Sequence, residues 1–174
     1  MYTLCTQLAD QLAMAGQSSI YFSLEQSRFE LISKGLSRLS TRYYLLKGKI
    51  DYSTALTAMQ VRTQGRSNQV VARAIGEYKK FAVREMFICD SLNLDGIKQK
   101  IVRYIERYQT VPVVIVDYLQ IVQSCSYRSS TKEVIDRVIM ELKRLQREHN
   151  LVMFLISSLN RENYMLPITE ANFK

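Results

Sequence analysis

The chain has 174 residues, a length that fits one domain and allows roughly 70% of the unfolded surface to be buried. Hydrophobic residues make up 47% and charged residues 23%, which excludes a disordered chain, and there is no apolar run of about 18 residues to span a membrane. The formal net charge of +8 favours an acidic partner, with nucleic acid first and an anionic membrane surface second.

Four short apolar runs alternate with helical patterns along the chain. The runs cover residues 20–24, 86–89, 111–116 and 151–156. Their apolarity is continuous, which is typical of strands buried on both faces of a parallel sheet. Strands separated by helices form βαβ units, so the sequence predicts an α/β fold, a three-layer sandwich around a parallel sheet.

The helices of the first half have readable ends. The first helix is expected to end at Gly16, and a capping box of Ser27 and Glu30 begins the second. Ser53 and Ser67 are the expected N-caps of two basic helices. The apolar stripe of the first helix, expected to face the core, is Leu4, Leu8, Leu12 and Ala13.

Two more helices are predicted in the second half. Ile97, Ile101 and Ile105 mark one of them at helical spacing. Ser130 caps the last helix, whose apolar stripe over residues 134–145 is also expected to face the core.

Basic residues are concentrated between Arg28 and Arg84, where only Glu30, Asp51 and Glu77 oppose them. This segment is a candidate nucleic-acid surface, and a solvated basic face is an equally good interpretation.

Two apolar strands are followed by carboxylates. Asp117 ends the most apolar run, which is the Walker B pattern for holding Mg²⁺ through water, or else a cap for the next loop. Glu25 follows residues 20–24 and could polarise a water that attacks a phosphate, or else favour the N-terminus of the next helix.

Small polar residues follow the last two strands. Gln120 lies three residues past Asp117, and Ser157, Ser158, Asn160 and Arg161 follow the last run. All are expected at the same edge of the sheet, where they could sense a γ-phosphate or simply belong to loops.

A loop rich in serine, residues 124–130, is bordered by cations. Arg128, Lys132 and Arg137 could line a path for single-stranded DNA, whose phosphates need cations, or belong to a mobile surface loop.

Three segments together resemble successive motifs of the motor domain of DnaB-type replicative DNA helicases. They are Phe22–Glu25, Val116–Gln120 and Ile156–Arg161, and their order and spacing agree with the family. The resemblance spans essentially the whole chain, including a helical insert around residues 47–51. It implies a RecA-like P-loop NTPase core that hydrolyses ATP with Mg²⁺, translocates on single-stranded DNA and unwinds duplex.

The resemblance also implies roles for single residues. Glu25 matches the catalytic base, Asp117 the magnesium ligand and Gln120 the residue that reads the γ-phosphate. Ser158 and Arg161 are expected at the nucleotide, while Arg128, Lys132 and Arg137 are expected to face DNA in the channel of a hexameric ring. Primase and a helicase loader are the further partners expected.

The chain departs from the family pattern at three places. Met1 and Tyr2 stand where the Lys and Ser/Thr of the phosphate-binding loop are expected, Ser158 replaces a usual Gln, and the chain stops before the segment that carries the trans-acting Arg and Lys fingers. We therefore expect residues 1–174 to form one partial domain, truncated at both ends, that lacks the P-loop strand and has no significant ATPase activity alone.

Two other functions remain open. Another RecA-like ATPase, of the KaiC or RadA type, is disfavoured by the segment Asp117–Gln120. A non-catalytic module that binds DNA or a helicase ring is the other alternative, and the absent P-loop favours it for this chain taken literally. The absence of a secretory signal and the three scattered cysteines indicate a cytoplasmic protein without a metal-binding cysteine cluster.

Overall fold

The computed structural model describes residues 2–23, 25–46, 55–90, 92–122 and 131–157. These residues contain a sheet of four strands, all parallel, in the order β2-β1-β3-β4. The strands are β1 (Ser19–Ser23), β2 (Glu85–Ile88), β3 (Val113–Asp117) and β4 (Val152–Leu155). Each was predicted from its apolar run to within two residues at either end.

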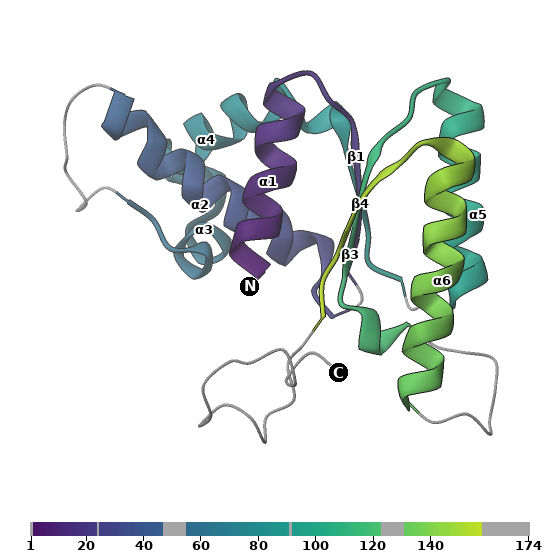
Figure 1. Ribbon diagram of the computed structural model, residues 1–174. Coiled ribbons are helices and arrows are strands. Elements are labelled where there is room, and N and C mark those ends of the chain that lie inside the picture. The colour runs from purple at the N-terminus through teal and green to yellow at the C-terminus, as the bar shows by residue number, and fades with distance from the viewer. Residues whose placement is uncertain (1, 24, 47–54, 91, 123–130, 158–174) are drawn as a thin grey trace.

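Helices cover both faces of the sheet (Figure 1). One layer holds α1 (Tyr2–Met14), α2 (Arg28–Leu46), α3 (Ala58–Gln64) and α4 (Gln69–Lys79). The other holds α5 (Leu94–Tyr108) and α6 (Thr131–His149). Three short 3₁₀ turns complete the order, η2 (Gly65–Ser67), η3 (Ala82–Arg84) and η4 (Leu119–Ile121). The predicted three-layer sandwich is confirmed, and among the helices described none is both long and apolar enough to cross a membrane.

The two central strands form the core because helices lie on both of their faces. All five residues of β1 and of β3 are buried. On one face Ile20 and Val114 pack with Ile97, Ile101 and Leu142 of α5 and α6. On the other face Tyr21 and Ile115 pack with Ala9 and Leu31 of α1 and α2.

β4 differs from this pattern. Met153 and Leu155 pack against the core cluster shared with α5 and α6. Val152 and Phe154 point to the other face and are 56% and 41% exposed, because no helix that the structure describes covers that side of the strand. The prediction of burial on both faces was therefore wrong for β4, which is an edge strand among the residues described.

The buried face of α1 also differs from the predicted stripe. Leu4 is 70% exposed, whereas Thr6, Ala9, Asp10 and Ala13 are buried. Arg38 of α2 explains the difference, since its Nη1 donates to Thr6 Oγ1 over 2.9 Å and its guanidinium pairs with Asp10. Polar residues that have a partner thus occupy the buried face of α1, where the spacing of apolar residues predicts leucine.

The first predicted helix boundaries are confirmed. Ser27 N donates to Glu30 Oε2 over 3.0 Å and Glu30 N donates to Ser27 Oγ over 3.3 Å, which is the expected capping box of α2. Gly16 follows α1 with a φ of 89°, a left-handed conformation that favours glycine.

The caps of the next two helices differ from the prediction. α3 begins after Thr57, which forms a capping box with Gln60, and α4 begins after Asn68, whose side chain accepts from two backbone amides. Ser67 is therefore not the cap, because the neighbouring asparagine takes that place. Ser53 and Ser130 lie outside the described residues.

Candidate functional site

The carboxyl ends of three neighbouring strands are tied together at one edge of the sheet. Ser23 lies opposite Asp117 in the register of β1 and β3. Beyond the strand ends, Ile156 N donates to Val116 O over 3.0 Å and Leu119 N donates to Ile156 O over 2.9 Å. The N-terminal end of α1 lies at the same end of the sheet (Figure 1). Ligands of open α/β sheets bind at this position, where carboxyl ends and helix N-termini meet.

Asp117 is the most deeply buried carboxylate of this edge, at 2% exposure. Its Oδ2 accepts a hydrogen bond from the hydroxyl of Tyr21. Tyr21 lies opposite Ile115, two residues before Asp117 on the same face, so its long side chain reaches diagonally across the strands. The other oxygen, Oδ1, is buried without a hydrogen-bond partner among the residues described. A buried acceptor that lacks a donor is costly, so this oxygen is suited to a cation or to a water held by a cation.

The protonation of Asp117 depends on what surrounds it. Burial raises the pKa of its carboxyl group most, and the nearby charge of Glu25 raises it further. The hydrogen bond from Tyr21 and the charge of Lys34 lower the pKa. A bound divalent cation would favour the ionised form in the same way.

Glu25 lies in a tight turn after β1 that Ser23 holds in place. Ser23 Oγ donates to Gln26 O over 3.0 Å and accepts from Gln26 N over 3.2 Å. Glu25 itself is exposed, and it is close enough to Asp117 for its charge to affect the pKa there. The structure thus brings the two predicted carboxylates together. Neither Ser23 nor Tyr21 was predicted, although a serine that bonds the backbone three residues on is a recognisable turn signal.

Gln120 joins the ends of β3 and β4. It lies in η4, and its Nε2 donates to Ser157 Oγ over 2.8 Å. The prediction that polar residues after these two strands gather at one edge is confirmed for this pair. Ser158 and Arg161 lie outside the described residues.

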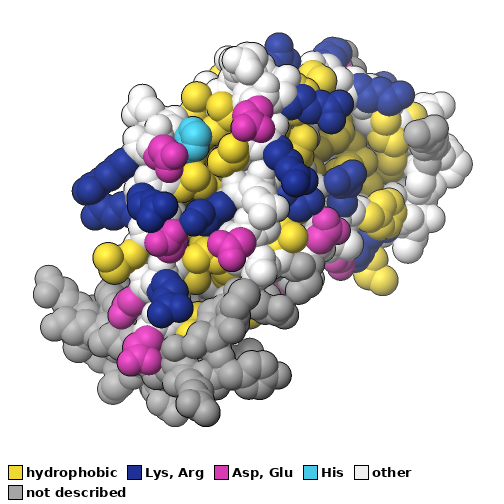
Figure 2. All heavy atoms as spheres, turned by 90° about the vertical axis from the view of Figure 1, so that its right-hand side faces the viewer, with side chains coloured by type: hydrophobic (Ala, Val, Ile, Leu, Met, Phe, Trp, Pro, Cys, Tyr) yellow, Lys and Arg dark blue, Asp and Glu magenta, His cyan; other side chains and the backbone are white. Residues whose placement is uncertain are grey.

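The predicted DNA-facing residues are only partly described. Arg128 and the side chain of Lys132 lie outside the described residues, and Arg137 is exposed on α6. Lysine and arginine side chains are spread across the face that α5 and α6 form, with hydrophobic side chains between them (Figure 2).

A cation at Asp117 would find few ligands among the residues described. Within the ranges that the structure describes, no group of three or more His, Cys, Asp or Glu residues could hold a metal ion. Mg²⁺ suits such a place, because it usually keeps several waters and binds one or two carboxylates together with substrate phosphates.

The strand order defines an α/β protein with a parallel sheet, a class of fold whose ligands commonly bind at the carboxyl ends of the strands. The family model of the DnaB-like helicase C-terminal domain matches residues 2–165, so the chain belongs to this family. A probable replicative DNA helicase of Trieres chinensis is 26% identical over 145 residues, which are 82% of this chain and 29% of that relative. The chain therefore spans less than a third of that relative's length.

Two solved structures share the fold. One, described as an ATPase domain, matches with a TM-score of 0.70 at 19% identity, over 92% of this chain and 54% of that one. The other, a DnaB-like replicative helicase described with its interactions with primase, matches with a TM-score of 0.73 at 19% identity, over 97% of this chain and 39% of that one. The expected RecA-like α/β fold is confirmed by these likenesses.

Proposed function

We propose that this domain belongs to the ATP-driven motor of a replicative DNA helicase, in which ATP is hydrolysed at the carboxyl ends of β1, β3 and β4. The observation that carries the proposal is Asp117, a buried carboxylate with one oxygen held by Tyr21 and the other without a partner among the described residues. Glu25 lies in the adjacent turn after β1, so a ligand at Asp117 Oδ1 is also within reach of a second carboxylate.

The residues of this edge take distinct roles in the proposal. Asp117 holds Mg²⁺ through water, and the ion supplies neutralisation of phosphate charge when it is bound. Glu25 orients the attacking water and accepts its proton, for which its exposed position suits it. Gln120, tied to Ser157, senses whether the γ-phosphate is present. Ser158 and Arg161 are proposed as further nucleotide contacts.

The second substrate in the proposal is single-stranded DNA, gripped inside a hexameric ring of copies of this domain. The net charge of +8 and the exposed cations of α6, Arg137 among them, support a partner with a phosphate backbone. Arg128 and Lys132 are proposed to contact the same strand. Primase is proposed as a protein partner, on the analogy of the solved DnaB-like helicase.

The test is ATP turnover by the complete gene product with and without single-stranded DNA. The unmodified protein is expected to hydrolyse ATP in a manner that DNA stimulates, and Glu25→Gln is expected to lower turnover by about a hundredfold or more, as for loss of a general base. Glu106→Gln, an exposed carboxylate of α5, is the matched control and should keep full turnover. DNA-stimulated turnover that survives Glu25→Gln unchanged would contradict the assigned base.

A further inference from the structure

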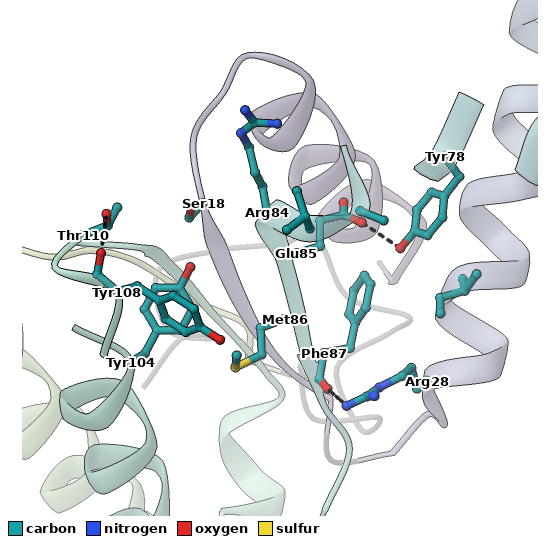
Figure 3. A pocket seen from close by; sticks show the side chains of 13 residues that line it. Ser18, Arg28, Tyr78, Arg84, Glu85, Met86, Phe87, Tyr104, Tyr108 and Thr110 are labelled. Atoms are coloured by element: carbon teal, nitrogen blue, oxygen red, sulfur yellow. Dashed lines mark hydrogen bonds between the residues drawn. The ribbon is translucent and has the colours of Figure 1, made fainter. Parts of the chain in front are cut away.

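A groove runs along the outer edge of β2, the strand at the other side of the sheet from β4. Two neighbouring cavities of about 570 Å³ and 530 Å³ form it, and both are lined by Arg28, Met86, Tyr104 and Tyr108. Figure 3 looks onto this edge, with Tyr104 and Tyr108 of α5 on one side of the strand and Tyr78 on the other. The strand itself is the floor of the groove.

The floor offers backbone groups for hydrogen bonding. In the part of the chain that the structure describes, β2 pairs with β1 alone. Arg28 Nη2 donates to Phe87 O over 2.8 Å, so the carbonyl group of Phe87 faces the groove. The N–H and C=O groups of one strand residue point to the same side, so the amide of Phe87 faces the groove as well. An edge of this kind is a template for another strand.

The wall formed by α5 is aromatic and apolar. The rings of Tyr104 and Tyr108 lie 4.6 Å apart between centroids, and Met86 points toward them from β2 (Figure 3). Tyr108 is 48% exposed, and Val83 at the rim is 85% exposed. Apolar side chains of a bound segment would be buried against this wall.

The rim of the groove is positively charged. The cations that line it are Arg28, Arg84, Lys100, Arg103 and Arg107. Among the described residues only Lys100 of these has an ion pair, with Asp90 at 3.6 Å. The other carboxyl group in the lining, Glu85, has its pKa raised to about 8 by burial and by the charge of Asp10, so it is mostly uncharged at neutral pH. The charge of the rim therefore complements an acidic ligand.

We propose that this groove binds an extended acidic peptide segment of a partner protein, which adds a strand to the free edge of β2. The backbone of Phe87 pairs with the peptide, alternate apolar side chains lie against Tyr104 and Tyr108, and acidic side chains meet Arg84 and Arg103. The site is independent of the nucleotide site proposed above.

A nucleic acid fits this groove less well. Bases bind by stacking on open aromatic faces, whereas Tyr108 already has Tyr104 against it and Arg107 5.5 Å from its ring centroid. The carbonyl oxygen of Phe87, which accepts from Arg28 with one lone pair, has a second lone pair that repels phosphate and can accept from a peptide amide. Strand addition uses both the donors and the acceptors of the edge.

The test uses a fluorescein-labelled peptide of about ten alternating glutamate and valine residues, a length that covers one strand. Its binding to the complete gene product is measured by fluorescence anisotropy. Two control peptides are measured in the same way. One has alternating lysine and valine residues, and the other has the glutamate–valine sequence with N-methylated backbone amides. Only the unmethylated acidic peptide is expected to bind, because it alone has both the charge and the backbone donors.

The matched protein variants locate the site. Arg84→Glu with Arg103→Glu is expected to weaken peptide binding by about tenfold or more, whereas Lys143→Glu with Arg147→Glu on α6 makes the same charge change and should alter it by less than about twofold. If Arg84→Glu with Arg103→Glu prevents folding, the N-methylated peptide still tests strand addition, because it is measured on the unmodified protein.

Several results would overturn the proposal. Absence of binding, or equal binding of the methylated peptide, would exclude strand addition. The groove would be assigned to nucleic acid by two results together. An oligothymidylate would displace the peptide, and the Arg84→Glu, Arg103→Glu variant would bind the oligothymidylate as much more weakly as it binds the peptide. Sedimentation that shows the same variant dissociating an oligomer would assign it to a second copy of the chain.

Discussion

Glu85 and Asp10 place two carboxyl groups together between α1, α2, α4 and β2. Tyr78 Oη donates to Glu85 Oε2 over 2.7 Å, and Arg38 pairs with Asp10. Glu85 Oε1 is buried and has no donor among the residues described. A proton on Glu85 turns this oxygen from an unpaired acceptor into a donor that can face Asp10. Burial first, and the charge of Asp10 second, raise the pKa of Glu85 from 4.5 to about 8.

The folded protein favours the protonated form of Glu85, and this decides how the stability of the fold changes with pH. Glu85 stabilises the fold fully below its unfolded pKa of 4.5, and this stability is lost as the pH rises through its folded pKa of about 8. Between these values the free energy of unfolding falls by up to about 1.4 kcal/mol for each pH unit. The total loss is of the order of a few kcal/mol, which is a large part of the stability of a small domain.

Glu85→Gln removes this titration without removing the contacts. The amide group donates to Asp10 and accepts from Tyr78, as the protonated carboxyl group does. We expect the variant to lie closest to the unmodified protein near pH 5 and to exceed its stability increasingly up to pH 8, by an amount of the order of a few kcal/mol. Urea unfolding at intervals from about pH 5 to pH 8.5 measures the difference.

The comparison of two pH curves isolates Glu85 from the other titrating groups. Glu106→Gln, an exposed residue of α5, serves as the control and should give a curve parallel to that of the unmodified protein. A parallel curve for Glu85→Gln would refute the reasoning, since it would mean that Glu85 carries no proton at neutral pH.

Three further predictions concern the site, the sheet edge and the charge. Tyr21→Phe removes the hydrogen bond that lowers the pKa of Asp117, so the acidic limb of ATP turnover should move to higher pH in a pH–rate profile; an unmoved limb would count against that hydrogen bond. Val152 and Phe154 are exposed on the edge strand β4, so the chain should self-associate, and Val152→Lys should reduce this association in sedimentation. A clean monomer of the unmodified chain at tens of micromolar, on the order of the concentrations where exposed apolar surface drives association, would contradict this. Affinity for oligothymidylate should fall by about tenfold or more between about 50 and 200 mM salt, and a flat profile would argue against phosphate contacts.

The sheet was predictable because its central strands are buried on both faces. β1 and β3 carry continuous apolar runs that no surface element would have, and the carboxylates after them lie at the strand ends where they were expected. The meeting of Gln120 with Ser157 followed from the same rule, since the ends of parallel strands share one edge.

The polar contacts inside the layers were not predictable from spacing. Asp10 is a charged residue on the buried face of α1, and its burial depends on Arg38, which is 28 residues away. The hydrogen-bond partner of Asp117 is Tyr21, which in the sequence cannot be told from an ordinary core residue of β1. Ser67 and Asn68 are both good capping residues, and only the path of the chain decides between them.

The most direct test of the proposed site is the effect of Mg²⁺ on the binding of a non-hydrolysable ATP analogue, measured by calorimetry on the complete gene product. Magnesium is expected to strengthen binding by about tenfold or more in the unmodified protein, in Glu25→Gln and in the control Asp95→Asn. Asp117→Asn should lose that dependence, because the buried oxygen that is free to hold the ion is replaced. If Asp117→Asn keeps the magnesium dependence of the unmodified protein, the nucleotide site does not lie at the end of β3.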